Sequence, residues 1–254
     1  MRFASLGSGS AGNALVVQSG KTTVLLDCGF GVREMQLRLG RLGLEAEKIS
    51  AILVTHEHDD HIGSALQLSA RHNIPLYLSH GTLQSTGKRD VLSTAHLIDS
   101  HTDFAIGDIQ VQPYPVPHDA REPVQFSFSN GEHRLGVLTD TGMSTPHIER
   151  TLSGCHALVL ECNHDLEMLE KGSYPHSLKQ RIKSRYGHLD NTTASELLSR
   201  LDNRQLQHIV AAHLSAQNNT PELAKTALSR ALGCHQDWIG VAEQEHGFDW
   251  RCIT

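Results

Sequence analysis

The chain lacks the features that direct a protein to a membrane or out of the cell. No apolar run approaches the roughly 20 residues of a membrane-spanning helix, and residues 1–10 lack the apolar core of a secretory signal. We therefore expect a cytoplasmic protein with no membrane partner. The five cysteines are odd in number, widely spaced and without a CxxC pair, which predicts buried free thiols rather than disulfides or a zinc ribbon.

Positive charge and aromatic residues are also scarce. Lys and Arg number 22 against 28 Asp and Glu, the net charge is −6, and aromatic residues make up 5% of the chain. Binding along a nucleic acid neutralises many phosphates with Lys and Arg. The balance therefore argues against a protein that coats nucleic acid, but it permits a nuclease that grips one end. Histidine is abundant at 18 residues, and it is the commonest protein metal ligand.

Extended and helical patterns alternate along the 254 residues. Ser19-Gly20-Lys21 and Asn130-Gly131 lie between strand-like runs and predict hairpin turns. Strands in meanders with helices between them, in two successive halves, predict an α/β protein whose two sheets pack together with helices outside. The expected strands and hairpins cover residues 2–6, 14–27, 51–54, 75–79, 126–140, 157–161 and 208–212, and the expected helices 32–42, 63–72, 177–187, 193–201 and 220–233.

Cap residues predict the ends of two of these helices. Thr193 and Glu196 have the spacing of a capping box, which places a helix start at Thr193. Thr220 followed by Pro221 predicts the start of the last helix, and Gly233 predicts its end.

Three glycines within residues 7–12 formally match the spacing of a dinucleotide-binding loop. That loop requires a helix at its third glycine, because the pyrophosphate binds at the helix N-terminus. Residues 13–21 contain a β-branched pair and a turn instead, which argues against a dinucleotide cofactor. The loop is then either a tight turn or a phosphate-facing loop, in which Ser8, Ser10 and Asn13 bind substrate.

The segment VTHEHDDHIG follows a strand-like run and holds His56, His58, Asp60 and His61. Where a strand ends in a turn, the first two side chains can point at one position and the last two at a second position nearby. The spacing therefore suits two adjacent divalent cations, and Zn, Mn and Fe accept imidazole and carboxylate ligands. The alternative is a solvated charged loop, in which unligated neighbours would repel one another.

Further ligands should come from the ends of other buried strands, because those ends share one edge of the two sheets. His118 follows VQPYPVP, Asp140 ends the run RLGVLTD, and His213 ends HIVAAH. Each residue alone would be an ordinary loop residue. Their shared position after apolar runs makes all three candidate ligands.

The order HxHxDH, His, Asp, His resembles the metallo-β-lactamase superfamily over nearly the whole chain. The resemblance implies an αββα sandwich of two mixed sheets, with two metals at one edge and a hydroxide between them as nucleophile. Metal coordination makes this chemically reasonable, because it lowers the pKa of water from about 15.7 toward 7. Asp27 resembles the family's aspartate that supports the metal loop, although a strand-end cap is an equal alternative. The implied ligands are His56, His58 and His118 for one metal, Asp60, His61 and His213 for the other, and Asp140 between them.

Other segments resemble nucleases of this superfamily. RYGHLDNTTASELL and HLSAQNN are similar to motifs of the RNase Z group, in which the position of His188 implies a proton donor. The segments GSGSAGN, PHDAREPVQFSF, LVLECNHD, YPHSLKQRI, GHLDN and HLSAQNN resemble the YycJ/WalJ group. That resemblance implies 5′-to-3′ degradation of DNA, catalysed with Asp60 and His188, and a role in DNA repair. Gln125 and His176 depart from the group's pattern, which leaves the substrate details open.

The predicted helix over 177–187 carries Lys179, Arg181, Lys183 and Arg185 and leads to His188. A cationic helix beside two metals can hold a phosphate backbone, and we take Lys179 and Arg181 as candidate contacts; a solvated helix face explains the same charges. The polar residues at the end of the strand-like run 157–161 and just after it are expected to shape the pocket without binding metal, and Asn163 among them is a candidate substrate contact. That group is Glu161, Asn163, His164 and Asp165.

The spacing of the ligands also predicts the domain organisation. About seventy residues separate Asp140 from His213, too few for a β-CASP insertion, since a domain needs at least roughly 50 to 100 residues beside the fold's own elements. We therefore expect a single catalytic domain over residues 1–254.

The ligand set alone does not name a substrate. The leading hypothesis is a dinuclear phosphodiesterase acting on nucleic acid, most specifically a DNA exonuclease. The alternative enzyme is a small-molecule hydrolase for a thioester or lactone, which would need an apolar, aromatic-lined pocket. A non-catalytic metal-binding protein is a third reading, and a missing ligand would favour it.

Overall fold

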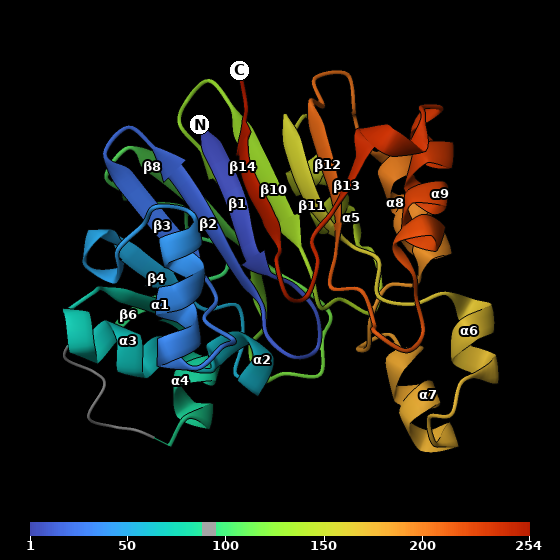
Figure 1. Ribbon diagram of the computed structural model, residues 1–254, viewed down its shortest axis with the longest axis horizontal. Coiled ribbons are helices and arrows are strands. Elements are labelled where there is room, and N and C mark those ends of the chain that lie inside the picture. Colours follow the sequence, from blue (N-terminus) through green and yellow to red (C-terminus); the bar gives the residue numbers. More distant parts are fainter. Residues whose placement is uncertain (88–94) are drawn as a thin grey trace.

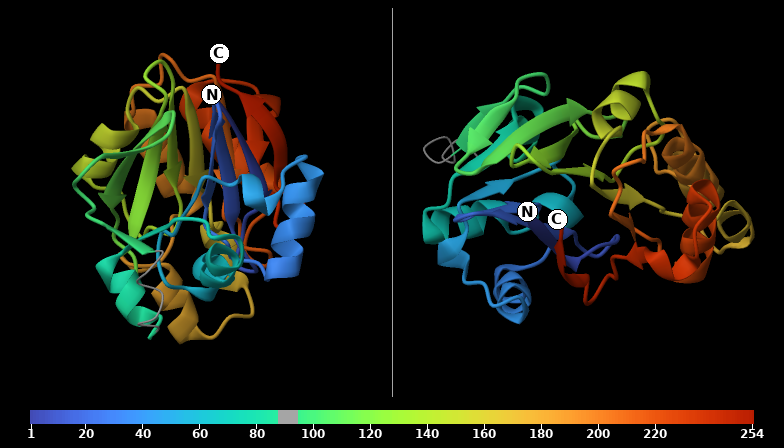
Figure 2. Two further views of the ribbon diagram at one scale, coloured as in Figure 1. Left: turned by 90° about the vertical axis from the view of Figure 1, so that its left-hand side faces the viewer. Right: turned by 90° about the horizontal axis from the view of Figure 1, so that it is seen from above.

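The computed structural model describes residues 1–87 and 95–254. In these residues two mixed seven-stranded sheets pack face to face, and helices cover both outer faces (Figures 1 and 2). The predicted αββα sandwich is confirmed.

The first sheet joins an antiparallel half to a parallel half. Strands β14, β1, β2 and β3 pair antiparallel, and β3, β4, β5 and β6 pair parallel. In spatial order the strands are β14 (Phe248–Cys252), β1 (Arg2–Gly7), β2 (Ala14–Ser19), β3 (Thr22–Leu26), β4 (Ala51–Leu53), β5 (Leu76–Ser79) and β6 (Ala95–Ile98).

The second sheet has the same plan. Strands β7 to β10 pair antiparallel, and β10 to β13 pair parallel. In spatial order the strands are β13 (Ile239–Val241), β12 (His208–Ala212), β11 (Ala157–Glu161), β10 (Arg134–Leu138), β9 (Val124–Ser129), β8 (Ile109–Pro115) and β7 (Phe104–Ile106). Parallel neighbours need crossover connections, and these are helical in both sheets.

The helices supply these crossovers and cover the outer faces (Figure 1). In chain order they are α1 (Val32–Arg41), α2 (Asp59–Ile62), α3 (Ala65–His72), α4 (His80–Ser85), α5 (Pro146–Leu152), α6 (Leu166–Lys171), α7 (His176–Ile182), α8 (Asn191–Arg200) and α9 (Pro221–Leu232). None of the helices in these described ranges is long and apolar enough to cross a membrane.

Strands with two apolar faces explain the layers. In β4, Leu53 packs between the sheets, whereas Ile52 packs under the helices of the first sheet. Val159 and Leu158 divide in the same way on β11. Continuous apolar runs therefore become inner strands that are buried on both faces.

The C-terminal strand returns to the first sheet, which the pattern of two successive halves did not predict. β14 pairs with β1 rather than with its neighbours in sequence. The Ile253 amide donates to the Met1 carbonyl at 2.8 Å, and both chain ends lie at one end of the molecule (Figures 1 and 2).

Two predicted helix boundaries were wrong. α8 begins two residues before the predicted capping box, because the Asp190 side chain accepts from the amides of Thr192 and Thr193. α7 ends at Ile182 rather than continuing to residue 187. The predicted caps of α9 are confirmed: Thr220 accepts from the Leu223 amide, and Gly233 takes the left-handed conformation with φ 63°.

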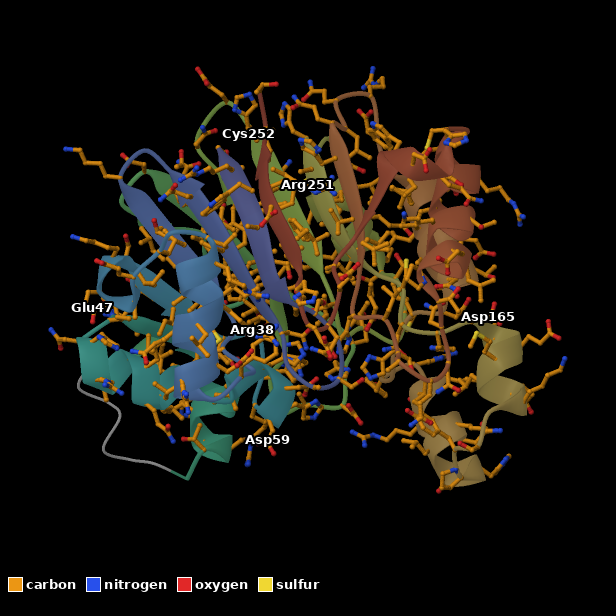
Figure 3. All side chains as sticks on the ribbon, viewed as in Figure 1. Arg38, Glu47, Asp59, Asp165, Arg251 and Cys252 are labelled. Atoms are coloured by element: carbon orange, nitrogen blue, oxygen red, sulfur yellow. The ribbon has the colours of Figure 1, made fainter. Side chains whose placement is uncertain are left out.

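All five cysteines are free. Cys28, Cys155 and Cys162 are buried as predicted, and burial raises the pKa of Cys155 to about 11. Cys252 is exposed, contrary to the prediction, and it lies at the opposite end of the molecule from Asp59 of α2 (Figure 3).

Candidate metal centre

The histidine-rich turn begins where β4 ends, and a single helical turn sets its geometry. His58 occupies the N-cap position of α2, and its carbonyl accepts from the amides of His61 and Ile62, both at 2.9 Å. The turn packs directly on Gly29, where an added Cβ would lie 1.8 Å from the Asp60 carbonyl oxygen. Glycine is therefore required beneath the turn.

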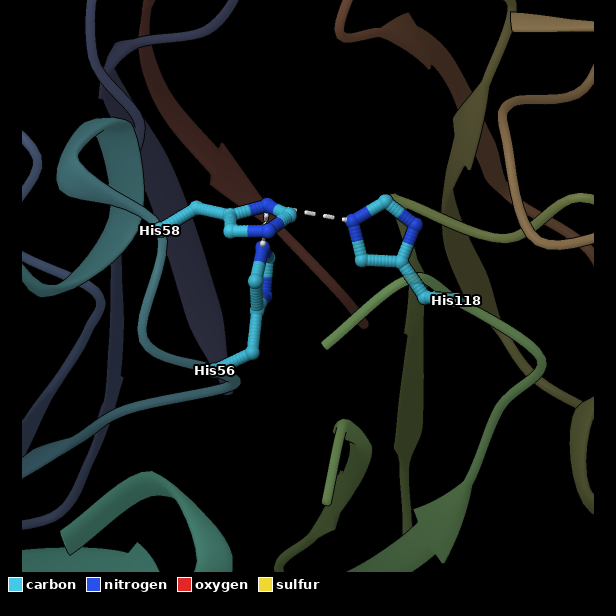
Figure 4. Close-up of side chains that lie close together, drawn as sticks. All are labelled: His56, His58 and His118. Atoms are coloured by element: carbon cyan, nitrogen blue, oxygen red, sulfur yellow. Dashed lines mark hydrogen bonds between the residues drawn. The ribbon is translucent and has the colours of Figure 1, made fainter. Parts of the chain in front are cut away.

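Three histidine rings converge on one point beside this turn. His56 Nε2 lies 3.1 Å from His58 Nδ1, and His118 Nε2 lies 3.3 Å from the same atom (Figure 4). His118 comes from the segment after β8, in the second sheet. The sheets thus bring together residues that are 60 positions apart.

A second group of candidate metal ligands lies next to the three histidines, and the two groups are called the donor groups below. The Oδ2 atom of Asp60 is 3.6 Å from His61 Nε2 and 3.6 Å from His213 Nε2. Asp140 lies between the groups, because its carboxylate is 3.0 Å from His61 Nε2 and 3.9 Å from His118 Nε2. The structure therefore brings together all seven side chains that the sequence singled out as ligands.

Each of four histidines has its Nδ1 bonded to the protein and its Nε2 directed at the donor groups. Such partners fix the tautomer and orientation of a metal-binding imidazole. The partners are Thr55 Oγ1 for His56 at 2.9 Å, Asp27 Oδ2 for His61 at 2.8 Å, the Gly187 carbonyl for His118 at 3.2 Å and Glu161 Oε1 for His213 at 3.0 Å. Histidines and carboxylates presented in this way fit divalent cations such as zinc.

Asp27 holds the histidine-rich turn in place through hydrogen bonds to Thr55 and His61. Its carboxylate accepts from the backbone amide of Thr55 at 2.9 Å and from the Thr55 hydroxyl at 3.0 Å, beside the bond to His61. Because that hydroxyl donates to Asp27, it accepts from His56. One buried carboxylate therefore orients two of the candidate ligand rings.

Backbone strain is concentrated at this edge. Four residues other than glycine have positive φ in the described ranges, and three belong to the site: Asp27, Asp140 and His213, at 61°, 51° and 55°. Each lies within two residues of the end of a strand, and left-handed backbone is uncommon for residues other than glycine. Strain of this kind persists where the surrounding structure over-determines it, commonly at functional sites.

The buried charges need cations or protons to balance them. Asp140 Oδ2 and His213 Nε2 are buried and have no hydrogen-bond partner of good geometry among the described residues. Burial alone would lower the pKa of His213, but Asp140, Asp60 and Glu161 raise it to about 10. Burial alone would raise the pKa of Asp140, but His213 and His61 hold it well below its ordinary value. Without cations, protons take their place at the donor groups.

Glu161 lies at the centre of a hydrogen-bond network, a role that the sequence did not predict. It is fully buried at the end of β11; Oε1 accepts from His188 at 2.9 Å and from His213 at 3.0 Å, and Oε2 accepts from two backbone amides. Burial opposes ionisation, but His188 and these bonds lower the pKa of Glu161 to about 2. Its position at the end of a buried strand, like that of Asp140, was the available signal.

His188 stands beside the two donor groups at the surface of the pocket. Its Nδ1 lies 2.9 Å from Glu161 and 3.6 Å from Asp140, and its side chain is 23% exposed. Burial lowers its pKa, but Glu161 and Asp140 more than offset this and raise it. The two carboxylates therefore favour the protonated form of the ring.

The N-terminal glycine loop packs inward. The Ser8 hydroxyl bonds Asn13 at 3.0 Å and accepts from the His213 amide at 2.9 Å, whereas Asn13 Nδ2 lies 3.1 Å from His61 Nε2. Both side chains are buried, so they hold the metal loops rather than face substrate, contrary to the prediction. Ser10 lines the pocket. The loop leads into β2 and no helix begins there, as the argument against a dinucleotide site required.

The predicted cationic helix does not direct its lysines toward the pocket. Lys179 and Lys183 bond Glu170 on the far side of α7, and Arg185 lies beyond the helix end. Arg181 does line the pocket, where it pairs with Asp119. The prediction that Lys179 contacts substrate is therefore not supported by its position.

The remaining polar residues of this edge hold loops together. Asn163 lines the pocket and donates to the His213 carbonyl at 2.9 Å, and Asp165 caps α6. His164 is buried beside Asp190. Gln125, one of the two departures from the group pattern, donates to the Thr139 carbonyl at 2.8 Å and so supports the residue before Asp140. The other departure, His176, is exposed as the first residue of α7.

A pocket of about 570 Å³ opens above the donor groups. Five carboxylate residues line it, and Arg181 is the single Arg or Lys among its described lining residues. An anionic substrate would be repelled from such a surface without bound cations. The carboxylates are Glu57, Asp59, Asp60, Asp119 and Asp140.

Comparison with known proteins agrees with this geometry. The beta-lactamase superfamily domain matches residues 22–210. The chain is 34% identical to the exodeoxyribonuclease YycJ of Bacillus anthracis over 100% of this chain and 97% of the relative. It is 32% identical to the exodeoxyribonuclease WalJ of Streptococcus pneumoniae, over 94% of this chain and 91% of the relative. The metallo-beta-lactamase fold protein YhfI of Bacillus subtilis superposes with a TM-score of 0.77 at 16% identity, covering 98% of each chain.

The matches extend over both sheets and all the candidate ligands from His56 to Asp140. The chain therefore belongs to the beta-lactamase superfamily, within the family of the exodeoxyribonucleases YycJ and WalJ, and is a metal-dependent hydrolase.

Proposed function

We propose that this protein is a nuclease that hydrolyses phosphodiester bonds with two divalent cations, Zn, Mn or Fe, and more specifically a 5′-to-3′ DNA exonuclease. The observation that carries the proposal is the pair of donor groups joined by Asp140, beside which Glu161 holds His188. The His188 Nδ1 atom lies 3.6 Å from the Asp140 carboxylate. The names of the relatives YycJ and WalJ support DNA as the substrate.

The candidate ligands divide by geometry into two sets. His56, His58 and His118 would hold one cation, and Asp60, His61 and His213 the other, with Asp140 contacting both. When bound, the cations would activate water at neutral pH and offset negative charge on the phosphate oxygens. The protein itself would orient the phosphate through the imidazole rings, which are held by their Nδ1 partners.

His188 would donate the proton that the leaving oxygen requires. Its Nδ1 is engaged by Glu161, which leaves Nε2 for the substrate. The raised pKa of His188 supports an acid that is protonated before reaction and can serve as donor.

The test compares three variants with the wild-type protein. We expect His58→Ala and Asp60→Ala to abolish hydrolysis of 5′-phosphorylated single-stranded DNA and to lose bound metal. We expect His188→Ala to retain metal but to lower kcat by roughly 100- to 10,000-fold, the usual contribution of a general acid. The exposed His235→Ala serves as the matched control, because its side chain is 82% exposed.

The same preparations should be offered RNA, a thioester and a lactone, with Zn or Mn as the metal. DNA cleaved in preference to the other substrates supports the proposal. Hydrolysis of the thioester or lactone alone would refute it, and normal DNA hydrolysis by His188→Ala would refute the acid assignment.

A further inference from the structure

One wall of the pocket is apolar and takes no part in the metal chemistry. Tyr174, Leu178 and Ile182 line the pocket, at intervals of four residues. Leu178 and Ile182 lie on one face of α7, because residues four apart are neighbours on a helix surface, whereas Tyr174 lies just before the helix, which begins at His176. All three side chains are half-buried where they line the pocket, and α7 has no fully buried residue.

The C-terminal end of this face is fixed to the reaction centre. The His188 amide donates to the Ile182 carbonyl at 3.0 Å, so the apolar wall is attached next to the candidate acid. The Asp119 amide donates to the Tyr186 carbonyl at 3.0 Å, beside the ligand His118. A displacement of α7 would therefore disturb the loops that carry His118 and His188.

Helices α6 and α7 follow each other directly and are called the α6–α7 unit. The N-terminal end of this unit is fixed as well. The Asp165 amide donates to the Asn218 carbonyl at 2.8 Å, and an added Cβ at Gly172 would lie 2.5 Å from the Asn218 side chain. The unit is tied to the second sheet at both ends. The apolar wall is thus a preformed surface rather than a mobile one.

The dimensions suit one nucleotide. An α-helix rises about 1.5 Å per residue, so Leu178 lies about 6 Å from Ile182 along α7, and Tyr174 lines the same pocket from the segment just before the helix. A volume of about 570 Å³ falls within the range of small-ligand sites, about 300 to 1,000 Å³. A phosphate at the donor groups would leave its own base alongside Leu178 and Tyr174.

The charge distribution directs the phosphates of a nucleic acid away from this wall. Phosphates belong at the cations and at Arg181, which lies on α7 beside the apolar residues and pairs with Asp119. Uncharged planar rings match an aromatic and two aliphatic side chains, since every base has a π face that stacks without sequence preference.

We propose that Tyr174, Leu178 and Ile182 form a subsite for the nucleobase next to the reacting phosphate, with the base stacked on Tyr174. The inference rests on the proposed nuclease function and names the part of the substrate that the pocket recognises. The subsite explains how a pocket with one Arg and five carboxylates can hold a strand end without a basic groove.

The test uses two single-stranded DNA oligonucleotides with identical phosphates. One carries normal bases, and the other has abasic tetrahydrofuran residues at the two terminal positions of each end, so the result does not depend on polarity. We expect the wild-type protein to cleave the normal substrate with a kcat/KM roughly 5- to 150-fold higher, the range for one base stacked on an aromatic ring. Tyr174→Ala should lower kcat/KM on the normal substrate toward the value on the abasic substrate and so lose this preference.

Two control variants separate stacking from a general loss of structure. Tyr174→Phe keeps the ring and should keep the preference. Tyr186→Ala removes a tyrosine that is 59% exposed and does not line the pocket, and should also keep it. As an independent readout, 2-aminopurine in the terminal position should lose fluorescence on binding the slow variant His188→Asn, and regain it when Tyr174→Ala is added.

The outcomes distinguish the subsite from the nuclease function. Equal cleavage of both substrates by the wild-type protein, or an equal loss on both in Tyr174→Ala, overturns the subsite and leaves the nuclease intact. Failure to cleave either substrate refutes both. Thioester hydrolysis that depends on Tyr174, without DNA cleavage, would assign the apolar wall to an acyl group instead.

Discussion

Glu161 offers the sharpest perturbation of the site, because Glu161→Gln keeps its shape and removes one acceptor. Each carboxylate oxygen accepts from two donors: Oε1 from the rings of His188 and His213, and Oε2 from the amides of Thr141 and Leu189. In glutamine, one oxygen becomes an NH₂ group. Whichever way the amide faces, two buried donors lose their acceptor.

The magnitude follows from the two orientations. If NH₂ faces the backbone amides, two buried donors at about 1–3 kcal/mol each cost about 2–6 kcal/mol of stability. If NH₂ faces the rings, both imidazoles can avoid this loss by accepting at Nδ1, which moves the proton to Nε2. For His213 that is the nitrogen directed at Asp60 and the candidate cation, so metal affinity falls roughly 10- to 100-fold, as for other partners of ligand histidines.

Urea unfolding with and without metal, chelator competition and kcat/KM measure these effects together. Glu167→Gln, on the exposed face of α6, controls for the change in charge, since its side chain is 73% exposed. Because the folded-state pKa of Glu161 is lowered to about 2, its contribution to stability is complete above about 4.5 and is lost as pH falls toward 2. A Glu161→Gln protein with wild-type stability, metal affinity and turnover would refute the reasoning.

Three further predictions concern the metal loops. Asp27→Asn should weaken metal binding roughly 10- to 100-fold in chelator competition, because an amide cannot accept from both Thr55 and His61; unchanged affinity would remove Asp27 from the site. Cation binding near neutral pH should release protons, because His213 has its pKa raised to about 10 and His61 has its pKa raised well above its ordinary value. Apparent affinity should therefore rise with pH toward 10, and an indicator dye that detects no protons would contradict this. Gly29→Ala should lower metal content, because its Cβ would lie 1.8 Å from the Asp60 carbonyl oxygen, and a fully loaded variant with wild-type stability would show that the turn can shift freely.

Much of the fold follows from local patterns. Runs such as AILV and ALVLE are apolar at every position, which is stable only where both faces are covered, and they became β4 and β11. His118, Asp140 and His213 were identified because each follows an apolar run. The inference held for Asp140 and His213 because β10, β11 and β12 run parallel and end at one edge. It held for His118 because β8 and β10 are both antiparallel to β9, so β8 ends at the same edge as β10.

Other assignments required the folded chain. Ser8 and Asn13 have the composition of a phosphate loop, yet the Ser8 hydroxyl donates to Asn13 Oδ1 and accepts from the His213 amide. The Asn13 side-chain amide donates to the Gly9 carbonyl and lies beside the His61 ring. Glu161 reads as an ordinary strand-end acid, and its network depends on two histidines that are 27 and 52 positions away.

The α7 segment shows most clearly which features follow from the sequence and which require the folded chain. Its sequence contains both a basic and an apolar pattern, and a helix of seven residues carries both on different faces. The sequence by itself indicated that a sandwich forms and that seven candidate ligand residues meet at its edge, because burial patterns and strand direction are local. Which face of α7 borders the pocket was decided only by tertiary structure, since Glu170 engages the lysines and the anchors at Ile182 and Gly172 set the rotation of the helix.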